Sequence, residues 1–105
     1  MSTYDIVRGA ILNKQQVIAT YDGHHREMCP HVIGHKNGKE QALFYQFGGT
    51  GSSGPIQFDG SPANWRCIPI DGLTNVSVRD GEWHTAQSHS KRQTCVDSVD
   101  VEVAH

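Results

Sequence analysis

Short runs of β-branched and aromatic residues, separated by glycine-containing turns, dominate the first half of the chain. A run over residues 17–21 ends at Asp22-Gly23, and a second run over residues 26–35 ends at Asn37-Gly38, ahead of a third over residues 42–47. Asp-Gly and Asn-Gly are typical of two-residue hairpin turns, because their central residues tolerate positive φ. The pattern therefore predicts three antiparallel strands joined by two hairpins.

A short helix is predicted ahead of these strands. Ser2 and Asp5 have the spacing of a capping box, in which the hydroxyl accepts a hydrogen bond from an early backbone amide. The apolar residues that follow recur at helical spacing: Ile6, Val7, Ala10 and Ile11. We expect a helix over residues 3–14 with its apolar side on the sheet.

The second half of the chain is less regular. Residues 48–62 are rich in glycine and proline and keep no period-2 alternation, which predicts a long loop that cannot hold a strand ladder. A strand is expected over residues 63–69, a turn over 71–75, another strand over 76–78 and a polar loop over 84–94. Val99, Val101 and Val103 alternate with acidic residues, as in a last strand with one buried face.

In the predicted strand 63–69, strict alternation places side chains on two faces. Trp65, Cys67 and Pro69 share one face, and Arg66, Ile68 and Ile70 share the other. In the second strand, Cys29, His31 and Ile33 are expected on one face, with Met28 and Val32 on the other.

These elements predict a mainly β fold, a small curled antiparallel sheet with a short N-terminal α-helix. A chain of 105 residues with 36% hydrophobic residues fits one domain over residues 1–105, in which 79–105 form an extension of unassigned structure. No apolar run approaches the roughly 20 residues that span a bilayer, and the N-terminus lacks the order of a secretion signal. We therefore expect a cytoplasmic location.

The charge and cysteine content narrow the function classes. A formal net charge of -2 provides no global field that attracts nucleic acid, so any anion-binding surface must be local. Cys29, Cys67 and Cys95 form an odd and widely spaced set, which is unlike the disulfide framework of a small secreted domain. They are predicted to be reduced thiols.

The candidate ligand-binding residues combine arginine with aromatic side chains. They are Arg26, Tyr45, Gln46, Trp65 and Arg66. Arginine offers a planar fork for phosphate or carboxylate, and Tyr45 or Trp65 offers a face on which a base can stack. The alternative is that the aromatic residues are core and that Arg26 pairs with Glu27 or Asp22 at the surface.

His31 is a further candidate, either as a wall of the binding site or as a histidine whose imidazole is satisfied by a neighbouring carbonyl. The second interpretation is favoured, since single histidines are commonly structural.

Metal binding and catalysis are less favoured. Cys29, His31 and His35, with Cys67, His84, His89 and Cys95 elsewhere, supply suitable atoms for tetrahedral zinc, but the spacing matches no zinc knuckle. A Cys-His pair such as Cys29 or Cys95 with His84 lacks any sequence signal that brings the groups together, and no Ser-His-Asp motif, nucleophile elbow or phosphate loop is present. The sequence predicts no cofactor, no metal and no enzymatic activity.

The order of these elements resembles the WYL-type domain of bacterial transcription regulators, an SH3-like barrel. The matching parts are residues 11–23, Arg26 with Pro30, residues 38–46 and residues 65–78. The tripeptide that names the family would fall at residues 41–43, where only Leu43 is kept, and a second arginine of the family would fall at Gly72. The resemblance implies a ligand-sensing module, which in some relatives engages nucleotides or single-stranded nucleic acid, here without a helix-turn-helix.

Two functional hypotheses follow. In the first, the chain is a regulatory binding module for a nucleotide or short oligonucleotide, held by Arg26 and Arg66 and stacked on Tyr45 or Trp65. In the second, it binds a protein partner or its own copies through the edge strand 99–103, with Asp97, Asp100 and Glu102 as gatekeepers against uncontrolled pairing.

Overall fold

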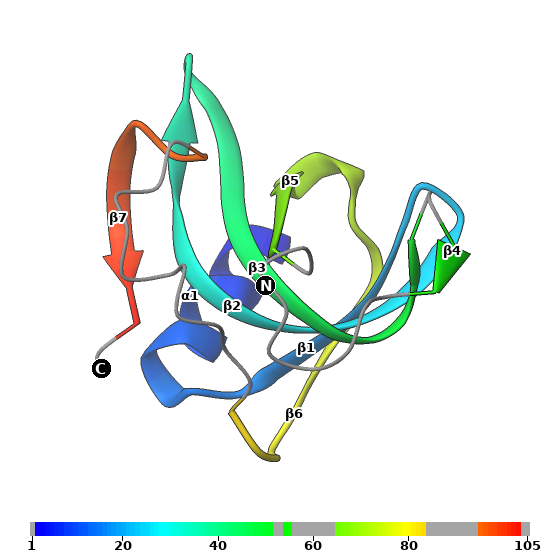
Figure 1. The fold of residues 1–105 in the computed structure, drawn as a ribbon. Coiled ribbons are helices and arrows are strands. Elements are labelled where there is room, and N and C mark those ends of the chain that lie inside the picture. Colours follow the sequence, from blue (N-terminus) through cyan, green and yellow to red (C-terminus); the bar gives the residue numbers. More distant parts are fainter. Residues whose placement is uncertain (1, 52–53, 56–64, 84–94, 104–105) are drawn as a thin grey trace.

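The computed structural model of the chain describes residues 2–51, 54–55, 65–83 and 95–103 (Figure 1). One helix and a strongly curved antiparallel sheet make up this part of the chain. In chain order the elements are α1 (Thr3–Asn13), β1 (Gln16–Tyr21), β2 (His24–Lys36), β3 (Lys39–Gly51), β4 (Gly54–Pro55), β5 (Trp65–Pro69), the 3-10 turn η2 (Ile70–Gly72), β6 (Thr74–Arg79) and β7 (Ser98–Glu102).

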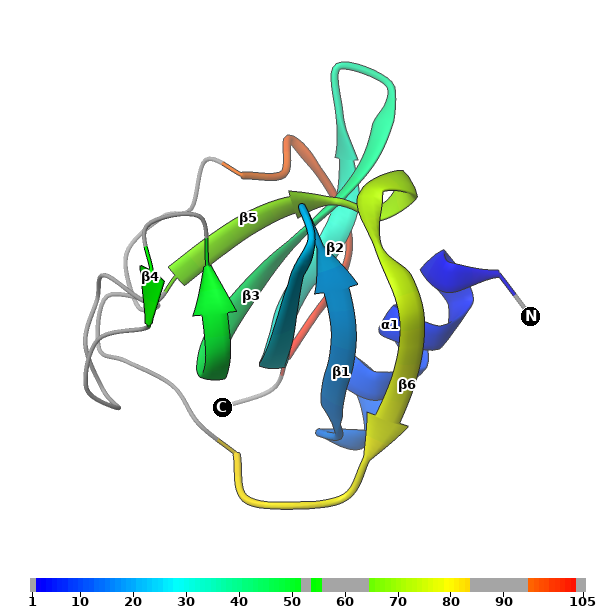
Figure 2. The same ribbon diagram turned by 90° about the vertical axis from the view of Figure 1, so that its right-hand side faces the viewer.

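The long strands β2 and β3 organise the sheet. The main order is β4-β3-β2-β1-β6, while β5 pairs with β3 and β7 pairs with β2, all antiparallel. Figure 2 shows the sheet bending round so that β5 and β6 lie at its two sides, joined through η2. The mainly β fold with a short N-terminal helix is confirmed, although within the described residues no ladder closes β5 onto β6.

The local turn and cap chemistry follows the sequence. Asp22 and Gly23 have φ of 53° and 75°, and Asn37 and Gly38 have φ of 52° and 80°, as two-residue hairpin turns require. The Ser2 hydroxyl accepts a hydrogen bond from the Asp5 amide at 3.2 Å, so the helix cap is confirmed.

The predicted loop over residues 48–62 is wrong at its beginning. β3 continues to Gly51, with Glu27 opposite Gly48 and Arg26 opposite Gly49, and β4 pairs with its end; the remaining residues of that loop lie outside the described part. Gly49 has φ of 82°, and a Cβ at Gly48 would lie 3.1 Å from the Glu27 side chain. Glycine is therefore needed here for a close strand approach at a bulge and does not end the ladder.

A second irregularity changes the faces of β2. The pairing with β3 shifts between Pro30 and Val32, so the strict alternation assumed from the sequence is interrupted. Met28 and Ile33 belong to the main core cluster, whereas Val32 packs in a separate cluster with Leu43. The expected grouping of Cys29, His31 and Ile33 on one face is wrong for this reason.

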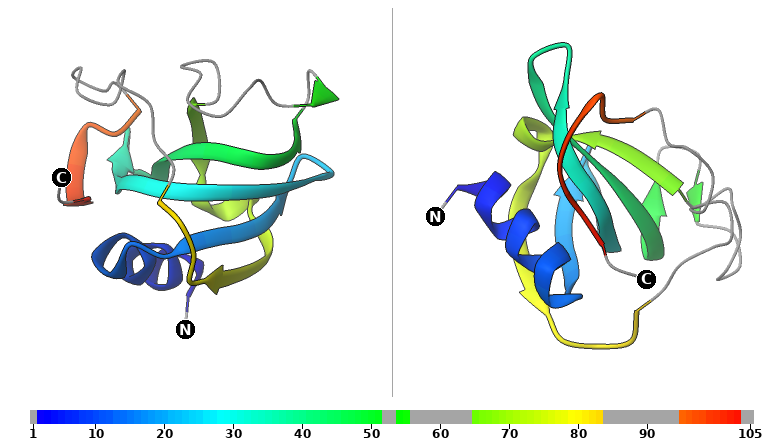
Figure 3. Two further views of the ribbon diagram at one scale, coloured as in Figure 1. Left: turned by 60° about the horizontal axis from the view of Figure 1, so that its bottom comes forward. Right: turned by 90° about the vertical axis from the view of Figure 1, so that its left-hand side faces the viewer.

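The main core lies between α1 and one face of the sheet. Val7, Ala10 and Ile11 of the helix are buried against strand residues such as Val17 and Met28. The right panel of Figure 3 shows α1 alongside β6 and β1, with β7 in front of β2, its antiparallel neighbour. Within the described residues no helix is of a length and apolarity to cross a membrane.

The prediction of three reduced thiols is wrong. Cys67 and Cys95 form a disulfide whose Cα atoms are 5.6 Å apart, and Cys29 is a buried free cysteine. The bond joins β5 to the segment before β7. These two segments are 28 residues apart in the sequence. Cysteine number and spacing could not reveal this contact, because it depends on how the C-terminal segment returns to β2.

Candidate functional site

The six predicted ligand residues lie on two different faces of the sheet. We call the face that carries Val17, Met28 and Phe44 the helix-side face, and the other the distal face. The pairs Phe44 with Arg66 and Tyr45 with Trp65 are directly opposite in the β3–β5 ladder, so each pair shares a face. Arg26, Gln46 and Arg66 therefore lie on the helix-side face, and His31, Tyr45 and Trp65 lie on the distal face.

Arg26 is the centre of the polar group on the helix-side face. Its residue is only 3% exposed, and its guanidinium donates from Nε to the Tyr21 carbonyl at 3.3 Å and from Nη1 to Gln46 Oε1 at 3.4 Å. Gln46 is itself fully buried and donates from Nε2 to the Gly48 carbonyl at 2.9 Å. Among the described residues, Arg26 forms no ion pair with a carboxylate.

The electrostatic environment of Arg26 disfavours its positive charge. Burial lowers the pKa of the Arg26 guanidinium from its usual value, and the neighbouring Arg66 lowers it further. Tyr21 and Asp22 oppose these effects, but each contributes less than Arg66. Two arginines thus act on one another at the edge of the core, and for Arg26 the effect of Arg66 is larger than that of Asp22.

Tyr21 completes this group and was not predicted from the sequence. Its ring lies under the Arg26 guanidinium, with 5.1 Å between the guanidinium carbon and the ring centroid. The same ring lies against Gly72, where a Cβ would be 2.6 Å from Tyr21 Cε1. The Tyr-Asp-Gly end of the first strand was the only sequence signal, and it indicated a turn.

The distal face holds an aromatic cluster. The His31 ring is 4.8 Å from the Trp65 ring and 5.0 Å from the Trp83 ring, and Tyr45 meets Trp65 edge to face at 5.1 Å. Tyr45 and His31 are fully buried, and His31 Nδ1 lies 2.9 Å from the Cys29 carbonyl. The favoured structural interpretation of His31 is therefore confirmed.

The structure does not bring Arg66 onto one face with Tyr45 and Trp65, as a ligand held by Arg66 and stacked on either ring would require. Successive residues of a strand point to opposite faces, so Arg66 points away from Trp65 and from its partner Tyr45, and Tyr45 is sealed from solvent. The alternative to a binding site is confirmed in part, since Tyr45 is a core aromatic residue. Its surface pair of Arg26 with Glu27 does not form, because Glu27 pairs with Arg79 at 2.9 Å and Arg26 is buried.

The cysteine and histidine residues give no metal centre in the described part of the chain. No group of three or more His, Cys, Asp or Glu side chains is arranged there to hold a metal ion. Of the residues considered for zinc, Cys67 and Cys95 are joined to each other, and His84 and His89 lie outside the described residues.

Comparisons of the chain with known protein families, with curated proteins and with solved structures find no match. The resemblance to the WYL-type domain stays a prediction from the order of the elements.

Proposed function

We propose that the chain is a regulatory binding module for a small anionic ligand, of the nucleotide or short-oligonucleotide class, held at Arg26 and Arg66. The observation that carries this proposal is a buried guanidinium, 3% exposed, beside a second arginine and without a carboxylate ion pair in the described residues. A buried guanidinium that hydrogen-bonds to neutral groups but forms no ion pair with a carboxylate costs folding free energy. A phosphate placed between the two arginines would compensate that cost.

The roles of the other residues follow from the two faces. Gln46 and Tyr21 hold the Arg26 fork in place, and Arg66, which is half-buried, gives the ligand its second cationic contact. His31, Tyr45 and Trp65 support the fold from the distal face and take no part in stacking a base. The WYL resemblance, which implies a sensor, supports a regulatory role without catalysis.

Calorimetric titration at low salt tests this function, because electrostatic contacts to phosphate are strongest there. Nucleoside monophosphates, diphosphates and short single-stranded oligonucleotides are the probes. We expect Arg26→Gln and Arg66→Gln each to weaken binding at least about tenfold, as loss of a charge-assisted contact does. Lys39→Gln is the matched control, since it removes the same charge from an exposed position and should leave affinity unchanged. Absence of binding by every probe rules out the proposal.

A second candidate function is strand-mediated association through β7. Val99 is 49% exposed on this strand, and within the described residues β7 pairs on one side only, with β2. An edge of this kind can accept a further strand. Light scattering over a wide concentration range distinguishes this function, since a monomer at all concentrations contradicts self-association.

A further inference from the structure

The two sulfurs of the Cys67–Cys95 disulfide differ in their access to solvent. Cys67 lies on β5 and is exposed, whereas Cys95 is 8% exposed and packs in the small cluster with Val32 and Val96. Thiol–disulfide exchange begins with attack of an external thiolate on one sulfur, so access decides which sulfur is attacked. The arrangement favours Cys67 as the attacked sulfur and Cys95 as the leaving group.

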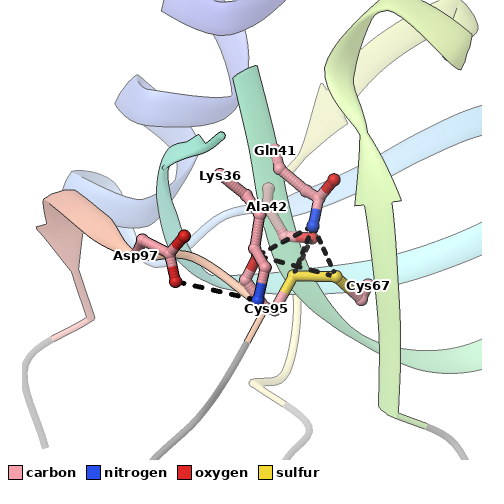
Figure 4. Close-up of a disulfide and its surroundings, with 6 residues drawn as sticks. All are labelled: Lys36, Gln41, Ala42, Cys67, Cys95 and Asp97. Atoms are coloured by element: carbon pink, nitrogen blue, oxygen red, sulfur yellow. Dashed lines mark hydrogen bonds and ion pairs between the residues drawn. A yellow bond between two sulfur atoms is a disulfide. The ribbon is translucent and has the colours of Figure 1, made fainter. Parts of the chain in front are cut away.

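The surroundings of the disulfide suit the reduced pair as well as the oxidised one. Figure 4 shows the Gln41 amide directed at both sulfurs; its Nε2 is 3.0 Å from Cys67 Sγ and 3.7 Å from Cys95 Sγ. Such a donor stabilises a departing thiolate. Cys95 Sγ also lies 3.4 Å from the Ala42 carbonyl, an acceptor that only a protonated thiol can use.

Besides the disulfide, residues 95–103 are attached to the helix and to β2. On the helix side, the Tyr4 hydroxyl and Arg8 Nε both donate to Asp100 Oδ2. Residues 95–103 contact β2 through the β7 ladder, through the Asp97 amide to the His35 carbonyl at 2.9 Å and through the Val103 amide to the His31 carbonyl at 2.7 Å. Lys36 and Asp97 form an ion pair of 3.7 Å, and most of the β7 residues are exposed. Val96 and Val103 are buried on either side of β7, whereas β7 itself buries little apolar surface, and such a strand opens locally at low cost.

We propose that the Cys67–Cys95 disulfide is a thiol–disulfide exchange site and that its reduction by a dithiol releases residues 95–103 from β2. A thiolate of the dithiol attacks Cys67 Sγ, the Cys67–Cys95 bond breaks, and Cys95 leaves as a thiolate that takes up a proton. The second thiol of the reductant then displaces Cys67 as a thiol and forms the reductant's own disulfide. Two electrons and two protons pass from the dithiol to the cysteine pair.

Release of the segment uncovers one edge of β2. Within the described residues, Val32, Ile33, Gly34 and His35 have β7 on one side and β3 on the other. Gly34 shows how close this pairing is, because a Cβ there would lie 2.7 Å from a Val96 methyl carbon. Reduction therefore converts a paired stretch of β2 into an open edge.

The direction of attack is tested in a Cys29→Ala variant, which leaves only the pair. The oxidised protein is treated with glutathione, quenched with acid, alkylated after denaturation and mapped by mass spectrometry. We expect the mixed disulfide on Cys67 to exceed that on Cys95 at least about tenfold. Equal adducts, or an excess on Cys95, overturn the assignment.

The release is tested by hydrogen exchange of the same variant before and after reduction by dithiothreitol without denaturant. We expect amides of residues 98–102 and their partners in residues 32–35 to exchange at least about tenfold faster, while β1 amides keep their protection. A Cys29→Ala, Cys67→Ser, Cys95→Ser variant, with its fold verified by circular dichroism, should show the reduced pattern. Resistance to reduction, unchanged exchange of these amides, or equal acceleration throughout the chain overturns the proposal.

Discussion

At the scale of single residues, the placement of Arg26 depends on a residue that lacks a side chain. Tyr21 supports the Arg26 guanidinium through both its carbonyl and its ring, and its ring occupies the space above Gly72. Gly72 is also the position at which the WYL resemblance would expect an arginine. A side chain at residue 72 and the Tyr21 ring cannot share this space, so the glycine and the Tyr21–Arg26 contact belong together.

Gly72→Ala should therefore destabilise the protein and weaken anion binding. The new Cβ would lie 2.6 Å from Tyr21 Cε1, which forces the ring to move, and overpacking of this kind costs about 1–3 kcal/mol. Gly9→Ala is the matched control, because nothing lies within 4 Å of a Cβ there and alanine favours the helix by up to about 1 kcal/mol. Urea denaturation of both variants measures the difference, and equal effects would contradict the proposed role of Gly72.

At the scale of elements, the sequence predicted what local chemistry decides. The hairpin turns, the helix with its Ser2 cap and the 3-10 turn after β5 follow from the φ preferences and spacing of a few neighbouring residues. The bulge in β2 and the continued ladder at residues 48–51 could not be predicted, because both depend on the opposite strand.

The sequence could propose the six candidate ligand residues but not their division between two faces of the sheet. Alternation alone separates Trp65 from Arg66 and Tyr45 from Gln46, since neighbours in a strand point to opposite faces. Which of these residues meets Arg26 depends on strand register and curvature, neither of which is encoded locally. The contact of Tyr21 with Arg26 across the first hairpin and the position of Trp83 beside His31 therefore required the structure.

The docking of α1 onto β7 gives the molecule a pH-dependent contact. The Tyr4 hydroxyl donates to Asp100 Oδ2 at 2.6 Å, and Arg8 Nε donates to the same oxygen at 3.2 Å. Burial and the Asp100 carboxylate raise the pKa of Tyr4 to about 12. The Tyr4 hydrogen bond, followed by Arg8, lowers the pKa of Asp100 from its usual value.

These two shifts predict losses of stability at opposite ends of the pH scale. A tyrosine pKa raised in the folded state contributes stability that is complete below about pH 10 and is lost as the pH rises through about 12. An aspartate pKa lowered in the folded state contributes stability that is present above about pH 4 and is lost as the pH falls through the folded pKa.

Tyr4→Phe should reduce the loss of stability at high pH, because it removes the titrating hydroxyl. It should also reduce the loss of stability at low pH, because it removes the main hydrogen bond to Asp100. Thermal unfolding midpoints measured between pH 3 and pH 12 check this prediction. Asp97→Asn is the control, because Asp97 pairs with Lys36 and not with Tyr4. Its unfolding midpoints should fall with rising alkaline pH as they do in the wild type. An unchanged alkaline limb in Tyr4→Phe would show that the contact does not contribute.

At the scale of the whole molecule, the disulfide connects parts of the sheet that backbone pairing leaves apart. β5 pairs with β3, and the segment from Cys95 leads into β7, which pairs with β2. The bond spans a sequence separation of 28 residues and lies beside the second core cluster on the distal face. It therefore restricts both the unfolded chain and, through residues 95–103, the native edge of β2.

Replacing both bonded cysteines separates these two effects. In the chain-entropy account, a cross-link across about 28 residues raises the free energy of the unfolded state by about 3–4 kcal/mol. Cys67→Ser with Cys95→Ser should therefore lower the free energy of unfolding by about the same amount. The urea m-value should rise, since the uncrosslinked chain exposes more surface on unfolding. Cys29→Ala, which leaves the bond intact, should keep the wild-type m-value.

If the disulfide acted only on the unfolded state, its loss would accelerate hydrogen exchange only through global unfolding. All slowly exchanging amides of the double variant would then change together. Selective acceleration at residues 98–102, together with the full loss of unfolding free energy, is expected instead, because the bond also fixes a weakly buried strand in the native state. A loss below about 1 kcal/mol with an unchanged m-value would contradict the entropic role.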